Sequence, residues 1–451
     1  MKEFLSNLNK KYVLLKRSWS PQQNLFYGFL TYVLGGFILL SLPWLQKESA
    51  PLLDHLFIAT SAVSTTGLVT VSVFDTYNIG GQLVVMILFQ LGGIGYLTFT
   101  TFMILSTTRR ITHWHRNLLK SEFTLPVTIK IKDFLKSLIL FTLVMEVLGT
   151  ILFLVAFMQE GKSFSEAIWI SIFHSISAFC TAGFSLFNSG FTEYADNSFI
   201  NFIISFLAIG GSLGFIVVTD FILWFKKKSH KLSFTTKIIF IGFLLLLSFG
   251  FGFFYFLEPA VADLQGKERF LAAFFQSMTA MTTVGFNTVD FGSFVLPMLL
   301  VTTFLMYIGA SPSGTAGGMK ITTLTAVFSI MKSRIRGSKK ITFLGKTIPF
   351  ERLYIATSSF IFYTTIIFFG TFLLTFSESF EFEKILFEVA SALGTVGLST
   401  GITGGLSSVG KSVIILLMFI GRLGVLTFGL AIWSKTITNE EREVLEEDIA
   451  V

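Results

Sequence analysis

The chain has 451 residues, of which 52% are hydrophobic, only 14% are charged, and 55 are phenylalanine. Apolar runs long enough to cross a bilayer recur from end to end, which excludes an ordinary soluble enzyme and indicates a multi-pass membrane protein. The single cysteine, Cys180, excludes an internal disulfide framework, and the net charge of +7 alternates with hydrophobic spans instead of forming a nucleic-acid-binding domain.

The predicted elements repeat four times along the chain. A basic segment, 1–24, shows no cleavage signal, so we expect the apolar segment after it to be retained as a helix. Each repeat then reads as a span, a short half-helix, a Thr-x-Gly-like segment and a second span. The first expected repeat, 25–109, has spans at 26–44 and 83–105 and a half-helix at 53–63; the second, 110–230, has spans at 137–157 and 199–224 and a half-helix at 167–179. The third, 231–340, has spans at 238–257 and 294–331 and a half-helix at 270–281. The fourth, 341–436, has spans at 353–376 and 413–434 and a half-helix at 385–393, and a tail, 437–451, follows it.

The half-helices are too short to cross a bilayer of about 30 Å, so they must re-enter it. Irregular backbone at that depth is tolerated only where protein buries it or where it lines water. A pore provides both conditions. The sequence therefore predicts an all-α membrane protein with four helix–pore-loop–helix repeats in pseudo-four-fold symmetry around one central pore.

A near-identical signature follows each half-helix: STTGL, CTAGF, TTVGF and GTVGL. Glycine allows positive φ and close backbone approach, so four such segments can place a ring of carbonyls around an axis, as in potassium channels. We expect a selectivity filter made of Thr65, Thr66, Gly67, Cys180, Thr181, Ala182, Gly183, Thr282, Thr283, Val284, Gly285, Thr395, Val396 and Gly397.

The second spans also share small-residue runs, GGIGYLT, GGSLGFIVVT and GRLGVLT, which favour close helix packing. The third repeat has GASPSGTAGG at 309–318 instead. Each interior Gly disfavours a helix by about 1 kcal/mol and Pro by about 3 kcal/mol relative to Ala. We interpret this run as a mobile gate beneath the filter, with a kinked packing hinge as the alternative. The predicted gate residues are Gly309, Ser311, Pro312, Gly314, Thr315, Gly317, Gly318 and Arg422.

The basic residues are unevenly distributed between the two sides. The segments 1–24, 109–132, 226–237 and 332–352, together with Lys435 and Arg442 at the C-terminal end, contain 25 of the 34 Lys and Arg residues, whereas the opposite loops contain 6. By the positive-inside rule, both termini face the cytoplasm and the filter faces outward.

These features together resemble the Trk/Ktr/HKT superfamily of potassium transporters over essentially the whole chain, and most of all the Ktr membrane subunit of the KtrB or KtrD type. The resemblance implies K⁺ as the transported ion, sodium-dependent uptake, no covalently bound cofactor, and a homodimer in the plasma membrane with one pore per subunit. It also implies a separate cytosolic nucleotide-binding ring of the KtrA/KtrC type, with nucleotide bound only there.

Isolated polar residues in the apolar segments are weighed individually. An arginine inside a span is unfavourable by roughly 2.5–3.5 kcal/mol, so Arg422 either pairs with carbonyls or carboxylates for packing or places a positive charge at the gate. Glu146 is expected to hydrogen-bond between helices. His55 and His174 are expected to be buried hydrogen-bonding groups, and Cys180 a small packing residue. Asp75 and Asp290 are either solvated or concentrate cations at the pore mouth.

A competing reading comes from residues 405–412, GLSSVGKS, which match the phosphate-binding pattern G-x-x-x-x-G-K-[ST]. That loop must follow a buried strand in a soluble α/β sheet, whereas here it opens a membrane span, so we expect a chance match. An ATP-driven pump is therefore the weak alternative, and an alternating-access Na⁺/K⁺ carrier is another. The pattern of titratable residues shows no catalytic constellation, so an enzyme is not expected.

Overall fold

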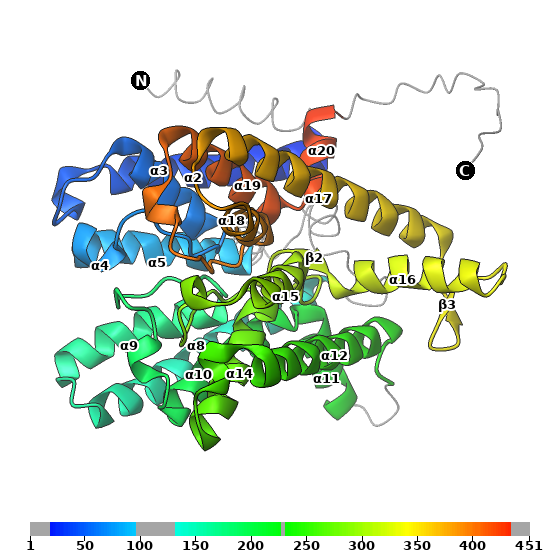
Figure 1. Cartoon of the computed structure of the whole chain (residues 1–451), viewed down its shortest axis with the longest axis horizontal. Coiled ribbons are helices and arrows are strands. Elements are labelled where there is room, and N and C mark those ends of the chain that lie inside the picture. Colours follow the sequence, from blue (N-terminus) through cyan, green and yellow to red (C-terminus); the bar gives the residue numbers. More distant parts are fainter. Residues whose placement is uncertain (1–18, 96–130, 227–230, 434–451) are drawn as a thin grey trace.

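The computed structural model describes residues 19–95, 131–226 and 231–433. The described chain is almost entirely helical (Figure 1). Four predicted segments lie wholly or partly outside these residues: 1–18 of the N-terminal segment, 96–105 of the first repeat's second span, most of the basic segment 109–132, and the C-terminal tail.

Four long helices correspond to the predicted first spans: α2 (Pro21–Leu40), α8 (Ile131–Gln159), α12 (Phe234–Leu257) and α17 (Phe350–Ser377). Each is apolar and long enough to cross a membrane; for α8 the apolar span is Leu135–Gln159. Their outward faces expose large apolar side chains, which is what lipid contact requires. The N-terminus of α2 is fixed by a capping box in which Ser20 and Gln23 exchange hydrogen bonds.

Four shorter helices correspond to the predicted half-helices: α3 (Leu52–Val63), α9 (Phe164–Phe179), α14 (Gly266–Thr282) and α18 (Phe382–Gly394). Each has an acidic residue in its first turn, where a negative charge is favourable near the positive end of the helix dipole. Their C-terminal halves are buried nearly completely. The short helices therefore end deep inside the protein.

The second helices differ from the prediction of uninterrupted spans. Helix α10 (Ser198–Ser212) turns by 92° into α11 (Phe215–Lys226), and α19 (Ser408–Leu423) turns by 98° into α20 (Val425–Trp433). Gly214 and Gly424 lie at these breaks with φ of +87° and +82°, a conformation that ends a helix and favours glycine. In the first repeat, α5 (Ile79–Ile94) ends at Gly95 in the same conformation.

The third repeat has the longest interruption. Helix α15 (Leu296–Tyr307) and helix α16 (Ile321–Ile335) are separated by a loop in which β1 (Ile308–Gly309) pairs in parallel with β2 (Met319–Lys320). The expectation that residues 309–318 do not form a helix agrees with this structure. The second helices of the first, second and fourth repeats therefore end or break at a glycine with positive φ, whereas α15 of the third repeat ends at Tyr307, before the loop.

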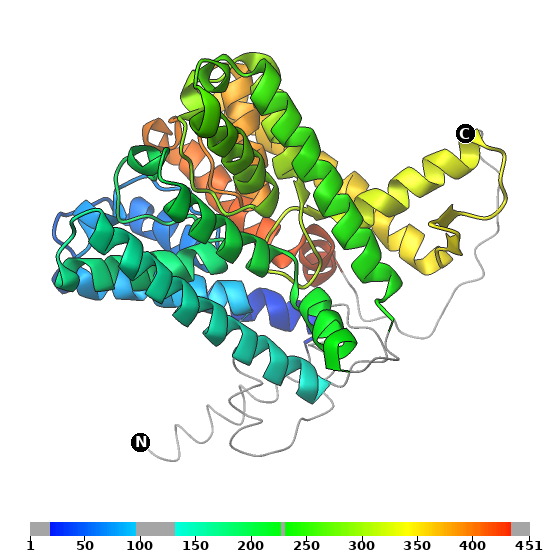
Figure 2. The same cartoon turned by 90° about the horizontal axis from the view of Figure 1, so that it is seen from below.

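Helix α16 and the first turns of α17 extend away from the helical body, joined by a hairpin of β3 (Thr342–Phe343) and β4 (Lys346–Thr347) (Figure 2). Leu344 and Gly345 form the turn, both with positive φ, as a two-residue hairpin of this kind requires. The sequence did not lead us to expect this hairpin. Shorter elements, α4 (Val73–Thr76), α13 (Pro259–Ala262), η1 (Pro43–Leu45), η2 (Thr192–Tyr194), η3 (Phe291–Ser293) and η4 (Thr403–Gly405), lie in the connections.

The second helix of each repeat packs against the half-helix of the next. Helix α5 contacts α9, α10 contacts α14, α15 contacts α18, and α19 contacts α3. The helices of the first and last repeats consequently lie together in one half of the molecule, and α8 to α14 lie in the other (Figure 1). Residues at the two ends of the chain are thereby brought together.

Candidate functional site

The segments that follow the four half-helices have the same backbone conformation. In each, a threonine has positive φ and a glycine two residues later does too. The threonines are Thr65, Thr181, Thr283 and Thr395, with φ between 48° and 57°, and the glycines are Gly67, Gly183, Gly285 and Gly397, with φ between 68° and 89°. Left-handed backbone is strained for threonine and concentrates at functional sites.

The four glycines contact one another in cyclic order. A Cβ atom added to Gly67 would lie 2.5 Å from the carbonyl oxygen of Ala182, and one added to Gly183 would lie 2.7 Å from that of Val284. In the same way, a Cβ atom added to Gly285 would collide with the carbonyl oxygen of Val396 in the fourth repeat.

The ring of contacts is completed by the fourth glycine, because a Cβ atom added to Gly397 would collide with the carbonyl oxygen of Thr66 in the first repeat. Real Cβ atoms essentially never come within 3.0 Å of such atoms, so no side chain fits at any of the four positions. The fold therefore brings together the four glycines and the carbonyls of four other residues from the predicted set, Ala182, Val284, Val396 and Thr66.

A serine or threonine six positions before each glycine hydrogen-bonds to the backbone of the segment that contains the glycine. Ser61 Oγ accepts a hydrogen bond from the N–H of Gly67, and Ser391 Oγ accepts one from Gly397, each at 3.1 Å. In the other two repeats, Ser177 Oγ donates to the carbonyl of Phe184 at 2.8 Å and Thr279 Oγ1 to that of Phe286 at 2.6 Å. Sequence reasoning missed these residues, although their identical spacing from the glycines could have identified them.

A second set of polar residues lies nine positions before three of the glycines. His174 pairs with Ser185, Gln276 pairs with Thr288, and Glu388 accepts hydrogen bonds from Ser399 and Thr403. Each connects a half-helix to the loop that follows the glycine. The carboxylate of Glu388 is fully buried and was also missed, although a glutamate in an apolar half-helix is a usable signal.

The loop between β1 and β2 lies directly against three of the threonines that have positive φ. The N–H of Gly317 donates to Thr283 Oγ1 at 3.1 Å, and Thr315 Oγ1 accepts from Thr181 Oγ1 at 3.2 Å. A Cβ atom on Gly317 would collide with Thr395 Oγ1. The predicted gate residues thus contact three of the four segments.

The same loop is held on the opposite side by the break in the second repeat. Ser311 N–H donates to the carbonyl of Ser212, Thr315 N–H donates to that of Gly211, and Phe215 N–H donates to that of Ser313. The ammonium of Lys320 donates to the carbonyls of Ala316 and Gly317 at 2.6 and 2.7 Å. Backbone groups that a helix would have paired internally are satisfied in this way.

Arg422 joins this loop to the first repeat. Its guanidinium donates to the carbonyl of Thr315 in the loop and to the carbonyls of Gly92 and Gly93 at the end of α5. Both expectations for this residue therefore contain part of the geometry: it pairs with backbone carbonyls, and one of these belongs to the predicted gate. Gly93 packs against Cys180, which precedes the second filter threonine.

The remaining polar residues mostly have packing roles. Glu146 accepts a hydrogen bond from Gln90 of α5 at 2.7 Å, and Cys180 Sγ donates to Gln90 at 3.2 Å, so Glu146 is bonded between helices as expected. His55 is buried and pairs with Tyr77. Among the described residues, no group of three or more His, Cys, Asp and Glu could hold a metal ion.

Two carboxylates in the connections that follow α3 and α14 have local partners. Asp75 accepts from Asn188 of the second repeat at 2.8 Å, and Asp290 accepts from the N–H of Gly292 at 2.9 Å. Asp75 follows Gly67 in α4, and Asp290 follows Gly285 just before η3.

The phosphate-loop-like segment 405–412 adopts a different structure. It includes the end of η4 and the first turn of α19, where Ser407 caps the helix by accepting from the N–H of Gly410. Lys411 makes an ion pair of 2.5 Å with Asp54 in α3, and their side chains are only 15% and 5% exposed. The lysine therefore joins the fourth repeat to the first, and the segment does not form a phosphate-binding loop.

Two of the four threonines with positive φ have a side-chain hydroxyl without a hydrogen-bonding partner. Within the described part of the chain, Thr65 Oγ1 and Thr395 Oγ1 are buried and accept or donate no hydrogen bond. A buried hydroxyl without a partner is unfavourable unless water or a ligand satisfies it. Backbone carbonyl oxygens such as those beside the four glycines are chemically suited to replace the hydration of a monovalent cation.

Comparisons with known proteins agree with this chemistry. A family model described as TrkH, cation transport protein, matches residues 31–437. The Ktr system potassium uptake protein B of Bacillus subtilis (strain 168) is 33% identical over 426 residues, which cover 93% of this chain and 95% of that protein. The Ktr system potassium uptake protein D of the same organism is 34% identical over 434 residues, covering 95% and 96%.

A solved structure shares the fold. The crystal structure of the potassium transporter TrkH from Vibrio parahaemolyticus superposes with a TM-score of 0.71 at 22% identity, covering 91% of this chain and 85% of that one. The apolar helices, the fold and the sequence similarity agree. The chain is therefore a membrane-embedded member of the TrkH family of cation transport proteins, a family that includes the Ktr proteins.

Proposed function

We propose that this chain is the ion-translocating subunit of a potassium uptake system, in which four repeats in pseudo-four-fold arrangement surround one channel-like pore. The observation that supports this most strongly is the cyclic contact of Gly67, Gly183, Gly285 and Gly397 with the carbonyls of the next repeat. Potassium is the proposed ion because the similar Ktr proteins B and D are potassium uptake proteins by name.

Selection of K⁺ is attributed to the backbone carbonyls of the four Thr-x-Gly-like segments. The glycines let the backbones converge, and the hydroxyls of Ser61, Ser177, Thr279 and Ser391 hold the carbonyl-bearing segments from behind. Carbonyl oxygens that are already held in place can replace the hydration shell of K⁺ with little rearrangement of the protein backbone. Sodium dependence, which the resemblance implies, remains part of the proposal.

Gating is attributed to residues 309–318. These residues lie against Thr181, Thr283 and Thr395, so a cation that leaves the filter on that side meets the loop. The loop has few regular backbone hydrogen bonds of its own and is fixed mainly by Arg422, Lys320 and the break between α10 and α11. A packing hinge is the alternative, and it predicts that removal of the loop lowers transport.

The proposed assembly is a homodimer with cytoplasmic termini and a cytosolic nucleotide-binding ring of the KtrA/KtrC type. The asymmetry of Lys and Arg supports this orientation. The protruding unit of α16, the hairpin and the start of α17 contains the 332–352 basic cluster, on the side that we assign to the cytoplasm (Figure 2).

An ATP-driven pump finds little support, because Lys411 is paired with Asp54 and the segment around it is a helix start. An alternating-access carrier is the second candidate, because a loop at 309–318 with two stable positions would also suit a carrier. Carriers of that kind typically contain inverted repeats, whereas the four repeats here run in the same sense.

The proposal is tested by replacing Gly67 or Gly285 with serine and measuring K⁺ and Na⁺ uptake in transport-deficient cells, with and without a regulatory ring protein. Each substitution adds a Cβ atom where none fits, so we expect discrimination of K⁺ over Na⁺ to fall. Gly401→Ser is the matched control, because Gly401 also has positive φ (+91°) but nothing within 4 Å of an added Cβ. Unchanged discrimination in the two filter variants would remove these glycines from the selectivity filter.

A further inference from the structure

A buried carboxylate lies close behind the fourth Thr-x-Gly segment. Glu388 belongs to α18, nine residues before Gly397, and is 0% exposed. Its two oxygens accept hydrogen bonds from the hydroxyls of Ser399, at 2.9 Å, and of Thr403. Ser399 is two residues after Gly397, and each residue spans at most about 3.6 Å. The carboxylate is therefore held within about 12 Å of Gly397, where backbone carbonyls converge.

This carboxylate has no cationic partner in the described part of the chain. No Lys, Arg or His among those residues forms an ion pair with Glu388. The hydroxyls of Ser399 and Thr403 stabilise a negative charge only in part, because burial of an ionised carboxylate is strongly unfavourable without a countercharge. A K⁺ ion in the proposed filter is such a countercharge. Ionisation of Glu388 and occupancy of the filter therefore favour each other.

The corresponding positions of the other three repeats carry no negative charge. Ile58 is apolar, and Nε2 of His174 accepts a backbone N–H, so that nitrogen carries no proton. The amide of Gln276 faces the hydroxyl and the N–H of Thr288 and the N–H of Val289, at 3.0, 3.2 and 2.9 Å, so its oxygen is the atom that accepts there. Gln276 thus supports the third segment with a neutral oxygen where the fourth repeat has a carboxylate.

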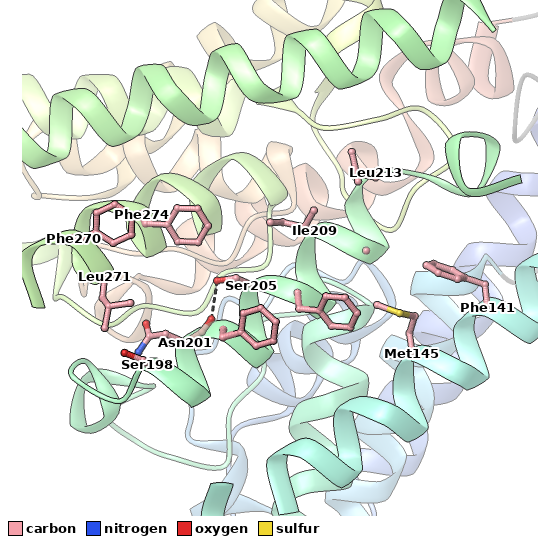
Figure 3. A pocket seen from close by; sticks show the side chains of 13 residues that line it. Phe141, Met145, Ser198, Asn201, Ser205, Ile209, Leu213, Phe270, Leu271 and Phe274 are labelled. Carbon is pink, nitrogen blue, oxygen red and sulfur yellow. Dashed lines mark hydrogen bonds between the residues drawn. The ribbon is translucent and has the colours of Figure 1, made fainter. Parts of the chain in front are cut away.

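The apolar hollow between α8, α10 and α14 is not an alternative place for the cation. This hollow has a volume of about 570 Å³, and its walls contain no Asp, Glu, Lys, Arg or His (Figure 3). Its polar lining consists of Ser198, Asn201 and Ser205. A cation that entered it would lose hydration without meeting a negative charge, which is unfavourable.

We propose that Glu388 sets the cation affinity of the filter as a fixed negative charge that acts through space, without contact with the ion. This role rests on the proposed function, because it requires K⁺ to bind beside the four glycines. At a separation of about 12 Å and an effective dielectric constant of about 20, the attraction between two opposite unit charges corresponds to about ten-fold in a dissociation constant. The charge acts equally on K⁺ and Na⁺, so its removal should weaken the binding of both ions by the same factor.

The test is thermal unfolding of the purified full chain in detergent, titrated with KCl or NaCl against choline chloride at constant ionic strength. The salt concentration that gives a fixed rise in melting temperature scales with the dissociation constant, and the measurement requires no transport. Glu388→Gln keeps the size and an acceptor oxygen but lacks the charge, so about ten-fold more KCl should be needed. Glu258→Gln is the matched control, because Glu258 is also fully buried but accepts from backbone N–H groups outside the four Thr-x-Gly segments; it should change the KCl requirement by less than about two-fold.

A reciprocal substitution moves the charge to another repeat. Gln276→Glu places a carboxylate where three donors already face an acceptor oxygen. Alone it should lower the KCl requirement, and combined with Glu388→Gln it should restore the requirement to within about three-fold of the wild type. The single Gln276→Glu variant also decides the question if Glu388→Gln does not fold.

Three results would overturn the role of Glu388 while leaving the proposed function intact. These are an unchanged KCl requirement in Glu388→Gln, a requirement that Gln276→Glu does not lower, and a change confined to K⁺, which would indicate altered filter geometry instead of a lost charge. Absence of any stabilisation of the wild type by KCl would count against K⁺ binding in the filter, and thus against the proposed function itself.

Discussion

Replacement of Arg422 by alanine tests the gate most directly. The guanidinium donates to the carbonyl of Thr315 in the loop and to the carbonyls of Gly92 and Gly93 in α5. Only the bond to Thr315 depends on the position of the loop. The other two hydrogen bonds go to α5, so their free energies are the same in both positions of the loop and do not affect the equilibrium between them.

A hydrogen bond from a charged donor contributes about 1.5–3 kcal/mol net, which corresponds to about 10- to 150-fold in an equilibrium constant. Arg422→Ala should therefore shift the loop toward its open position by up to this factor, and we expect the lower half of the range because Arg422 is half-buried. Removal of the positive charge acts in the same direction, since it lowers the electrostatic barrier to a cation.

The assay is K⁺ and Na⁺ flux into proteoliposomes that contain the purified chain without a regulatory partner, with expression and dimer content verified. Flux should rise for Arg422→Ala while K⁺/Na⁺ discrimination is retained. Arg422→Lys keeps the charge but not the forked donor, so an intermediate flux would separate the hydrogen bond from the charge. Flux at or below the wild-type level in a well-folded Arg422→Ala protein would refute the reasoning and favour a packing role.

Three further predictions concern the loop, the filter support and the phosphate-loop-like segment. Deletion of most of 309–318 should raise flux and weaken dependence on the regulatory partner; a folded deletion with wild-type or lower flux would indicate a packing hinge. Ser391→Ala removes the hydrogen bond from the N–H of Gly397, which contributes about 0.5–1.5 kcal/mol to the stability of this backbone segment, and should reduce K⁺/Na⁺ discrimination. Ser391→Thr should restore discrimination, because the third repeat has threonine at this position; equal discrimination in both variants would exclude support by the hydroxyl. Lys411→Ala should show no change in ATP dependence but should lower the melting temperature, because an unpaired buried Asp54 is unfavourable by about 3–5 kcal/mol. Stability should be recovered when Asp54→Asn is added, and ATP hydrolysis that the lysine substitution abolishes would instead support a pump.

The sequence alone determined the local order of the elements. Long apolar runs, half-helices and Thr-x-Gly-like segments are set by composition and short-range conformational preference, so the four half-helices were located to within a few residues. The interruption at 309–318 was likewise predictable, because Gly and Pro disfavour a helix wherever they occur.

The sharp bends at Gly214 and Gly424 were not predicted, although both glycines are visible in the sequence. An isolated glycine is tolerated in a helix, and only the packed structure reveals that it adopts positive φ and redirects the chain. Apolar composition on both sides of the break made the two helices look like one span.

Tertiary structure also decided which residues meet. The cyclic contacts of the four glycines, the bond from Arg422 to α5 and the ion pair between Asp54 and Lys411 join segments that are far apart in the chain. Spacing along a sequence cannot specify such partners, because they depend on how the last repeat closes against the first. The recurring pattern identified the residues of the candidate site, and the closed arrangement of the repeats determined their neighbours.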